Sequence, residues 1–260
     1  MSATVVVPAY NEGRRLPPFL SALCAAIGPT PLAVLVVDDG SRPEELARVG
    51  EALNQITQRY PQISLSLIRQ PLNRGKGAAL ALGFHKAKTP IIGFVDADGS
   101  IGADEVVRLY EELNSHTREA EPVAAVLGSR VRLLGRDVER SPLRHIIGRV
   151  FATLFSFLFD IPIYDSQCGC KFFLRSEVMP LLPLIQNQRW LWDTELLVLL
   201  YRSGRRILEL PISWVDKAGS KVSLFRDPFQ MFWGLLGLKS RLDDTNIPTP
   251  ASRRPLRKSA

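Results

Sequence analysis

The sequence predicts an α/β fold, with a mostly parallel, twisted sheet flanked by helices. In the first half of the 260 residues, short runs of β-branched residues alternate with helical patterns of apolar residues. Hydrophobic residues make up 46% and charged residues 23% of the chain, which excludes a disordered, collagenous or coiled-coil protein. Strands that alternate with helices favour a parallel sheet that is covered on both faces.

The elements of the first half follow in order. Apolar runs predict strands at residues 4–7, 32–37, 65–68, 91–95 and 123–127. Helical periodicity predicts helices at residues 13–27, 43–59, 75–88 and 103–115. Ligands of such sheets bind beyond the carboxyl ends of the strands. Polar segments follow four of these strands directly, at residues 8–12, 38–41, 96–100 and 128–130.

The second half has a different character. We expect helices at residues 144–159, 192–202 and 228–239, and strands at 171–174 and 206–210. These elements predict one domain over residues 1–242, with halves at 1–128 and 129–242. Residues 243–260 are rich in Pro, Ser and Arg, which predicts a basic tail without a packed structure.

Charge and cysteine usage narrow the class of protein. Of the formal net charge of +7, the tail supplies +4 through Arg253, Arg254, Arg257 and Lys258. The remainder is too small to indicate a nucleic-acid-binding surface. Three cysteines without CxxC spacing exclude a disulfide framework and argue against zinc, and they favour a reducing compartment such as the cytoplasm. No signal peptide or transmembrane helix is predicted.

Two acids follow the predicted strand at 91–95. In an extended segment, the carboxylates of Asp96 and Asp98 point to the same side, with Ala97 between them. Hard oxygen ligands suit Mg²⁺ or Mn²⁺, which commonly bridge carboxylates to phosphate oxygens. Acids also end strands in solvated turns, and that interpretation stays open for this motif.

Asp38 and Asp39 end a second strand of the same sheet. They could form a turn before a helix, or accept hydrogen bonds from a ribose or a base edge. Because adjacent carboxylates repel each other, a cation, amide donors or a base must compensate their charge. Tyr10, at the end of the first strand, offers an aromatic face for a base, or packs within its own loop.

Glycines flank Lys76 at the start of the predicted helix at 75–88. Amides exposed at a glycine-rich helix start suit a phosphate. Position 80 carries Leu80 where a dinucleotide fingerprint needs its third glycine, and the spacing to Lys76 does not fit a P-loop. The three histidines form no recognisable nucleophile motif, which argues against triad hydrolase chemistry.

Taken together, VVVPAYNE, VVDDGS, NRGKGAAL and DADG resemble family 2 glycosyltransferases of the GT-A fold, whose sheet is Rossmann-like. In the second half, GSR (128–130), DSQCGCKFF (165–173), WDTEL (192–196) and ELPISWVDKAGSK (209–221) resemble the polyprenyl-phosphate glycosyltransferases. That group includes dolichyl-phosphate β-glucosyltransferases and mannose synthases. DSQCG with the GSK segment leans towards the glucosyl branch.

The resemblance implies a nucleotide-sugar site and a metal site in the first half. Asp98 would be the main ligand of Mg²⁺ or Mn²⁺, with Asp96 near the ribose or the metal. Ser100 occupies a position where mannosyl relatives often carry glutamine, which puts a third protein ligand in doubt. The residues that would contact the nucleotide-sugar are Pro8, Tyr10, Glu12, Asp38, Asp39, Lys76, Asp96 and Ala97.

The resemblance also implies an acceptor site in the second half. Gln167 and the basic residues Arg130, Arg149, Lys171 and Lys221 would face the diphosphate and the acceptor phosphate. Arg130, Lys171 and Lys221 would join Asp98 in catalysis. Lys171 stands where many relatives carry arginine, so it keeps the charge but loses the bidentate fork. Asp193 and Glu195 would orient sugar hydroxyls, or form structural ion pairs instead.

The implied reaction is an inverting, metal-dependent transfer of a hexose to a polyprenyl phosphate. The donor favoured is UDP-glucose. The alternatives are GDP-mannose as donor, a non-lipid acceptor, and a non-catalytic binding protein. A prenyl tail stays in its bilayer, so we expect peripheral attachment to the cytoplasmic face of a membrane. Residues 150–159 and 228–239 are the candidate contacts, assisted by the basic tail. Both segments could instead fill the core or form the seam of a homodimer.

Overall fold

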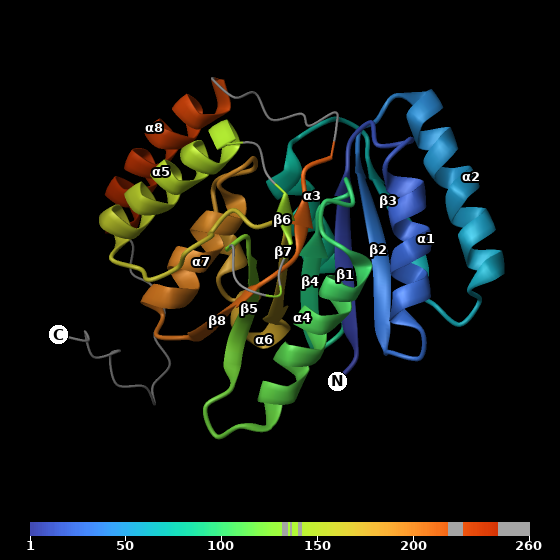
Figure 1. Ribbon diagram of the computed structural model, residues 1–260, viewed down its shortest axis with the longest axis horizontal. Helices are drawn as coiled ribbons and strands as arrows, with labels where there is room; N and C mark the ends of the chain where they lie inside the picture. Colours follow the sequence, from blue (N-terminus) through green and yellow to red (C-terminus); the bar gives the residue numbers. More distant parts are fainter. Residues whose placement is uncertain (132–134, 136, 140–141, 218–225, 244–260) are drawn as a thin grey trace.

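A computed structural model of the chain describes residues 1–131, 135, 137–139, 142–217 and 226–243. Within these residues, a seven-stranded sheet lies between two layers of helices (Figure 1). The strand order is β3-β2-β1-β4-β7-β5-β8. The strands are β1 (Ala3–Ala9), β2 (Leu32–Asp39), β3 (Leu65–Gln70), β4 (Ile91–Val95), β5 (Val123–Ser129), β7 (Cys170–Leu174) and β8 (Arg206–Pro211).

The sheet is mixed, with one strand running against the others. β1 pairs in parallel with both β2 and β4, β2 pairs in parallel with β3, and β5 pairs in parallel with β8. β7 is antiparallel to both β4 and β5, between which it is inserted. The predicted mostly parallel sheet is confirmed. The consequence of the insertion is that the segment leading into β7 arrives at the same edge as the carboxyl end of β4.

Helices cover both faces of the sheet. On one face lie α1 (Leu16–Ile27), α2 (Pro43–Arg59) and α4 (Ala103–Ser115). On the other lie α3 (Lys76–Lys86), α5 (Pro142–Phe159), α7 (Trp192–Arg202) and α8 (Arg226–Asp243). Shorter elements are α6 (Arg175–Val178), two 3₁₀ turns at 116–118 and 182–184, and a two-stranded sheet of β6 (Val138–Glu139) and β9 (Trp214–Val215).

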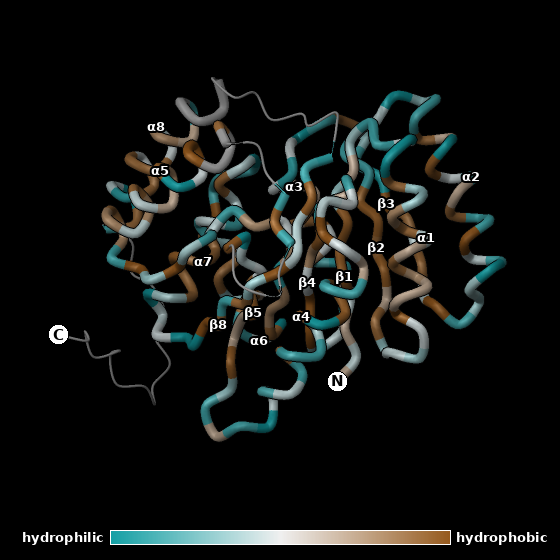
Figure 2. Tube along the Cα trace, in the orientation of Figure 1, coloured by the Kyte–Doolittle hydropathy of each residue, from teal (hydrophilic) through white to brown (hydrophobic). Residues whose placement is uncertain are grey.

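The central strands are apolar over most of their length because both of their faces are covered, and Lys171 of β7 is an exception. All five residues of β4 are buried, and so are all five of β7. Figure 2 shows this as brown strands at the centre and teal loops at the periphery. Continuous apolar runs of this kind are typical of strands buried on both faces. Most of the candidate polar groups therefore lie at strand ends and in loops, whereas Lys171 lies within β7.

The element boundaries differ from the sequence-based expectations at a few points. The helix expected from residue 13 begins at Leu16, and prolines occupy its first turn, where a missing N–H costs no helical hydrogen bond. The helix expected at 75–88 covers Lys76–Lys86 and follows Gly75, whose φ is +102°. The helix expected at 228–239 extends over Arg226–Asp243. β6, β9 and α6 were not predicted, since such short elements carry no periodic signal. The tail from residue 244 lies outside the described residues.

Candidate active site

The candidate site begins with two acids directly after β4. Asp96 and Asp98 follow this strand, and Ala97 between them is buried in the core. The Lys76 Nζ, in the first turn of α3, lies 2.6 Å from Asp96 Oδ1. The parallel sheet thus brings the end of β4 and the start of α3 together, so that the first acid of the motif already has a protein cation beside it.

The ionisation of this pair follows from its partial burial and from the charges around it. Burial raises the pKa of Asp96, and the positive charge of Lys76 acts in the opposite direction. Burial by itself would lower the pKa of Lys76, but the nearby carboxylates of Asp96 and Asp193 outweigh it, and the pKa is raised. Lys76 therefore carries a fixed positive charge at neutral pH.

The segment before β7 closes one side of Asp96. The Asp96 N–H donates to the Gly169 carbonyl over 2.9 Å. A Cβ atom added to Gly169 would lie 2.2 Å from Asp96 Oδ2, which is closer than real Cβ atoms approach. Any larger residue here would force the Asp96 carboxylate or the backbone to move, which gives the glycine of the DSQCG motif a physical reason. Sequence reasoning missed this contact, because it depends on β7 lying next to β4.

Asp98 lies near a second charged pair, at the start of α1. Asp98 Oδ1 accepts a hydrogen bond from the Ser100 N–H over 2.9 Å. The Arg15 guanidinium binds the Glu12 carboxylate through two hydrogen bonds of 2.7 and 2.6 Å. These hydrogen bonds raise the pKa of Arg15, with a further contribution from the Asp98 charge. Arg15 is a site residue that the sequence analysis did not single out.

The carboxylates suit a hard divalent cation with few protein ligands. Among the described residues, no group of three or more His, Cys, Asp or Glu side chains could hold a metal ion. Mg²⁺ is commonly held by one or two carboxylates together with substrate phosphates and water. Asp98, with Asp96 beside it, supplies oxygen ligands of this kind, so the residues present fit such an ion.

Asp38 and Asp39, at the end of β2, are both buried and both hydrogen-bonded. Asp39 accepts from the Gln70 side chain over 3.0 Å and from the backbone N–H groups of Arg74 and Gly75 over 2.9 and 2.8 Å. Asp38 accepts from the Ser41 N–H over 3.2 Å. Burial raises the pKa of Asp39, while the amide donors act to lower it. Amide donors are thus among the compensating groups expected for this pair, and Asp39 holds the loop that leads to Lys76.

The end of β1 lies beside this loop. Tyr10 is exposed, Pro8 is half-buried and Glu12 is buried. The Asn11 N–H donates to the Ser41 hydroxyl over 2.8 Å, which ties the β1 end to the β2 end. The structure therefore brings the predicted nucleotide residues of β1, β2 and α3 to one edge of the sheet. Their contacts with a ligand stay predictions.

Arg130, directly after β5, forms a bidentate pair in the second half. Its Nε and Nη2 atoms lie 2.7 Å from the two carboxylate oxygens of Asp165. The Asp165 charge outweighs the effect of burial and raises the pKa of Arg130. The backbone N–H groups of Tyr164 and Asp165 donate to Glu209 over 2.7 and 2.6 Å. Asp165 thus orients Arg130, a role that was not predicted.

Lys171 lies in β7 and is fully enclosed, with 0% of the residue exposed. Its Nζ lies 2.5 Å from Asp193 Oδ2 and donates to the Ser166 carbonyl over 2.6 Å. The ring centroid of Phe94 lies 5.4 Å from Lys171 Nζ and 5.1 Å from Lys76 Nζ. Two Lys–Asp pairs, one from each half of the chain, therefore meet around one aromatic ring.

The remaining predicted residues are placed as follows. Gln167 donates to the Trp190 carbonyl over 3.3 Å and contacts Thr194. Arg149, in α5, stacks on the Tyr164 ring at 3.8 Å, and its Nη1 atom is buried without a hydrogen-bond partner among the described residues. Glu195 is fully buried in α7. Lys221 lies outside the described residues.

Comparison with known proteins agrees with this architecture. Residues 4–179 match glycosyl transferase family 2. A dolichyl-phosphate beta-glucosyltransferase of Trichomonas vaginalis is 35% identical over 229 residues, which are 85% of this chain and 66% of the relative. The Saccharomyces cerevisiae and Homo sapiens dolichyl-phosphate beta-glucosyltransferases are 32% and 30% identical, over 88% and 92% of this chain and 71% and 75% of the relatives. The chain thus spans about two thirds to three quarters of these relatives.

Solved structures share the fold at lower identity. Glucosyl-3-phosphoglycerate synthase from Mycobacterium tuberculosis, in complex with Mn²⁺, UDP and phosphoglyceric acid, has a TM-score of 0.65 at 16% identity, over 96% of this chain and 80% of that one. The mannosyltransferase PcManGT from Pyrobaculum calidifontis, in complex with GDP-Man and Mn²⁺, has a TM-score of 0.60 at 19% identity, over 95% of this chain and 65% of that one. These neighbours show a GT-A fold. With the match over most of its length and a sheet that gathers its acids at one edge, the chain belongs to glycosyl transferase family 2.

Proposed function

We propose that this chain transfers a hexose from a nucleoside diphosphate sugar to a polyprenyl phosphate, with inversion at the anomeric carbon. The relatives' names favour glucose as the sugar and dolichyl phosphate as the acceptor. UDP-glucose is the donor that we propose, and UDP is bound in a solved structure of the same fold. The observation that carries the proposal is the meeting of the Lys76–Asp96 and Lys171–Asp193 pairs around Phe94. If Lys76 and Lys171 serve the donor and the acceptor, as the family resemblance implies, their charges would act on both substrates at this point.

The proposed reaction is a single displacement. An oxygen of the acceptor phosphate forms a bond to the anomeric carbon, and the bond from this carbon to the donor's phosphate oxygen breaks, with its electron pair leaving on the nucleoside diphosphate. The acceptor is an anion at neutral pH, so it needs no general base to remove a proton. It needs neutralisation and in-line placement instead.

Basic side chains of this chain would meet those needs. Lys76 offers a fixed positive charge on the donor side, where negative charge grows on the leaving group. Arg130 is held in one orientation by Asp165, and Arg149 has a buried N–H group without a partner among the described residues. Both suit a phosphate acceptor. Mg²⁺ or Mn²⁺ at Asp98, when bound, would neutralise charge on the diphosphate.

Lys171 would act less directly than the sequence suggests. Its side chain is closed off from solvent, and its ammonium is occupied by Asp193 and the Ser166 carbonyl. We propose that Lys171 fixes Asp193, which in turn lies within reach of Gln167. Pro8, Tyr10, Glu12, Asp38 and Asp39 would surround the nucleotide, and Lys221 would face a phosphate, as the family resemblance implies.

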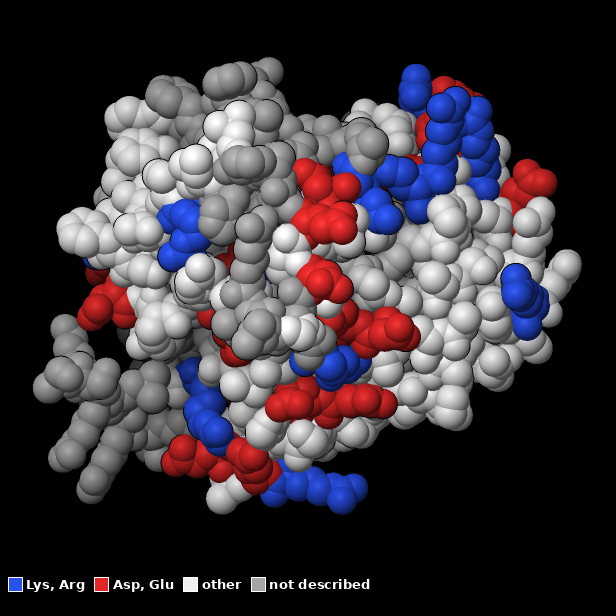
Figure 3. All heavy atoms as spheres, viewed as in Figure 1, with Lys and Arg blue, Asp and Glu red and all other residues white. Residues whose placement is uncertain are grey.

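A lipid-linked acceptor requires the chain to reach a membrane surface. None of the described helices is long and apolar enough to cross a bilayer. One side of α5 is nonetheless apolar and exposed, through Ile146, Val150 and Phe157, which are 59%, 64% and 83% exposed. Trp233 of α8, which packs beside α5, is 57% exposed. In Figure 3 this region, at the upper left, carries few charged side chains among the described residues.

These exposed residues support peripheral attachment to a membrane, and we propose that its cytoplasmic face is the one contacted. Phe155 and Phe159 of α5 are buried, so the same helix contributes to the core and offers apolar area to lipid. Bringing such area out of water is favourable by about 25 cal/mol per Å². A homodimer that covers α5 is the alternative use of this face. If the protein stays monomeric at every concentration tested and still binds vesicles, the result would favour membrane attachment over a homodimer.

A donor panel with a polyprenyl phosphate tests the proposed function. UDP-glucose, GDP-mannose and other labelled donors are incubated with Mn²⁺ and dolichyl phosphate, and label is counted in the organic phase. Label from UDP-glucose is the expected result, and label from GDP-mannose would support the mannosyl alternative. The resemblance to a synthase of glucosyl-3-phosphoglycerate makes 3-phosphoglycerate the matched soluble acceptor. Transfer to it alone would contradict a lipid acceptor, and nucleotide binding without any transfer would indicate a binding protein.

A further inference from the structure

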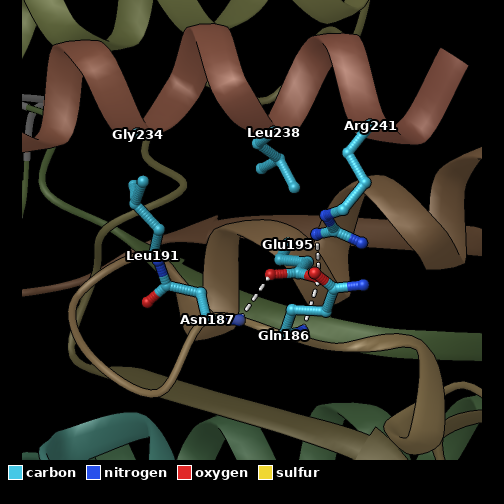
Figure 4. Close-up of a pocket in the computed structure, with 7 residues that line it drawn as sticks. All are labelled: Gln186, Asn187, Leu191, Glu195, Gly234, Leu238 and Arg241. Atoms are coloured by element: carbon cyan, nitrogen blue, oxygen red, sulfur yellow. Dashed lines mark hydrogen bonds and ion pairs between the residues drawn. The ribbon is translucent and has the colours of Figure 1, made fainter.

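Glu195 is a fully buried acid whose two carboxylate oxygens accept hydrogen bonds from protein donors. It lies in the first turn of α7, below α8 (Figure 4). The backbone N–H groups of Gln186 and Asn187 donate to its two oxygens over 2.9 and 3.0 Å. The Arg241 guanidinium of α8 also donates to Glu195 Oε1. With these donors in place and no exposed surface, Glu195 is not available to a sugar hydroxyl.

The segment that Glu195 holds forms the wall against the start of α3. The Gln188 carbonyl accepts a hydrogen bond from the Ala78 N–H over 3.1 Å. A Cβ atom added to Gly75 would lie 2.7 Å from the Gln188 carbonyl oxygen, and one added to Gly77 would lie 2.5 Å from Trp192 Cβ. Residues 188–192 therefore touch both neighbours of Lys76, at a distance that only glycine allows.

The same segment is tied to α8 on its other side. A Cβ atom added to Gly234 would lie 2.4 Å from Leu191 Cδ1, so the helix and the segment are in close contact. A small cavity of about 200 Å³ lies beside this contact and is bordered by Leu191, Glu195, Leu238 and Arg241. Arg241 is partly exposed and borders this cavity, so a smaller apolar side chain can replace it without crowding the core.

We propose that Glu195 and Arg241 form a positioning pair for the donor side of the site. Glu195 fixes residues 186–188, these residues fix the first turn of α3, and that turn sets Lys76 against Asp96. Arg241 anchors the arrangement to α8. Glu195 thus acts through Lys76, rather than on a sugar hydroxyl. The inference rests on the proposed function, in which the donor binds beside Lys76.

The positioning pair requires a carboxylate at residue 195. An ionised Glu has two oxygens that only accept hydrogen bonds, which matches two backbone N–H groups and a guanidinium. In Glu195→Gln, an NH₂ group faces donors, so one buried N–H group loses its partner. A shift of the loop by even a fraction of an ångström is passed to Lys76 through the glycine contacts.

The test compares Glu195→Gln with a control at another ion pair. Glu177 pairs with Arg205 over 2.7 Å, away from α3, and Glu177→Gln serves as the control. The first measurement is calorimetric binding of UDP in the presence of Mn²⁺. We expect Glu195→Gln to weaken UDP binding by about tenfold or more, since small misplacements in a site have large effects. Glu177→Gln should bind UDP as the wild type does.

A second measurement does not depend on a nucleotide. Hydrogen exchange at the Ala78 amide, which donates to Gln188, should speed up at least tenfold in Glu195→Gln and stay unchanged in Glu177→Gln. If Glu195→Gln does not fold, Arg241→Met replaces it, because Arg241 is partly exposed and borders the cavity. We expect Arg241→Met to weaken UDP binding and loosen Ala78 in the same direction.

The outcomes separate this inference from the proposed function. If the wild-type protein binds no UDP, the donor assignment is contradicted. The hydrogen exchange of the Ala78 amide would still show whether Glu195 and Arg241 form the positioning pair. If Glu195→Gln lowers the melting temperature but leaves the Ala78 amide exchange as in the wild type, Glu195 has a purely structural role and the proposed positioning role is contradicted. The same conclusion follows if Glu177→Gln changes UDP binding as much as Glu195→Gln does.

Discussion

Lys76 and Asp96 form a 2.6 Å ion pair that joins the first turn of α3 to the residue directly after β4. The first carboxylate of the Asp96–Asp98 motif is therefore neutralised by the protein itself. The second carboxylate, that of Asp98, accepts one hydrogen bond from a backbone N–H. This difference between two acids of one motif makes Asp98 the better candidate for a cation.

Asp98→Asn is therefore expected to lower Mn²⁺-dependent turnover about 100-fold, the usual cost of removing one electrostatic stabiliser of a developing charge. The matched control is Asp104→Asn, because Asp104 is an exposed acid in the first turn of α4, soon after Asp98 in the chain. The measurement is initial rate against Mn²⁺ concentration. Unchanged metal dependence in Asp98→Asn would remove this residue from the metal site.

Lys76→Met is expected to shift the acidic limb of the pH–rate profile to higher pH. Burial already raises the pKa of Asp96, and Lys76 opposes that effect by stabilising the carboxylate. Without the lysine, Asp96 stays protonated to a higher pH, so activity that needs the carboxylate is lost at a higher pH than in wild type. Lys88→Met, an exposed lysine beyond α3, is the control. If the acidic limb of the Lys76→Met profile lies at the same pH as in the wild type, the protonation of Asp96 does not control the rate.

Gly169→Ala should damage the site without a large effect on the core. Its new Cβ atom would meet Asp96 Oδ2 at 2.2 Å, and either the carboxylate or the backbone must move. We expect at least a tenfold loss of kcat/KM. Gly50→Ala is the contrasting variant, since no atom lies near its Cβ position in α2. It should retain activity and gain about 0.5–1 kcal/mol in the free energy of unfolding. Full activity of Gly169→Ala would contradict this contact.

Lys171→Met is expected to cost about 3–5 kcal/mol in the free energy of unfolding, because it leaves the Asp193 carboxylate buried without its partner. The double variant Lys171→Met with Asp193→Leu should be more stable than Lys171→Met alone, since no charge is then left unpaired. Urea denaturation of the three proteins checks both statements. A stable Lys171→Met protein with lost activity would instead support direct contact between Lys171 and a substrate.

Phe157→Glu combined with Trp233→Glu should weaken binding to vesicles at least tenfold, as expected from the roughly 1.5–3 kcal/mol gained when one large apolar side chain is buried. Leu72→Glu is the control, because Leu72 is 70% exposed but lies in the loop between β3 and α3. Co-sedimentation with vesicles of neutral and anionic lipids measures the effect. Equal loss in the control would argue against a specific contact through α5 and α8.

Local pattern was sufficient for much of the fold. Val5, Val6 and Val7 of β1 and the residues of β4 are apolar because their strands are buried on both faces, and such runs are visible without a structure. The helix starts were predicted less accurately, since the helix expected from residue 13 begins at Leu16, directly before its prolines. The acids that end β2 and those that follow β4 could be predicted to lie at one edge of the sheet, because parallel strands end at the same edge.

By itself, the sequence determined the succession of the main strands and helices along the chain, the family, and the edge at which the polar residues gather, since each depends on periodicity or on contiguous motifs. Only the tertiary structure decided which charges pair. Because β7 is inserted between β4 and β5, Gly169 contacts Asp96, and Lys171 and Lys76 both lie near the Phe94 ring. Because α8 packs nearby, Arg241 forms an ion pair with Glu195. Ion pairs of this kind join residues far apart in the chain. Their partners follow from packing and desolvation, which no local pattern encodes.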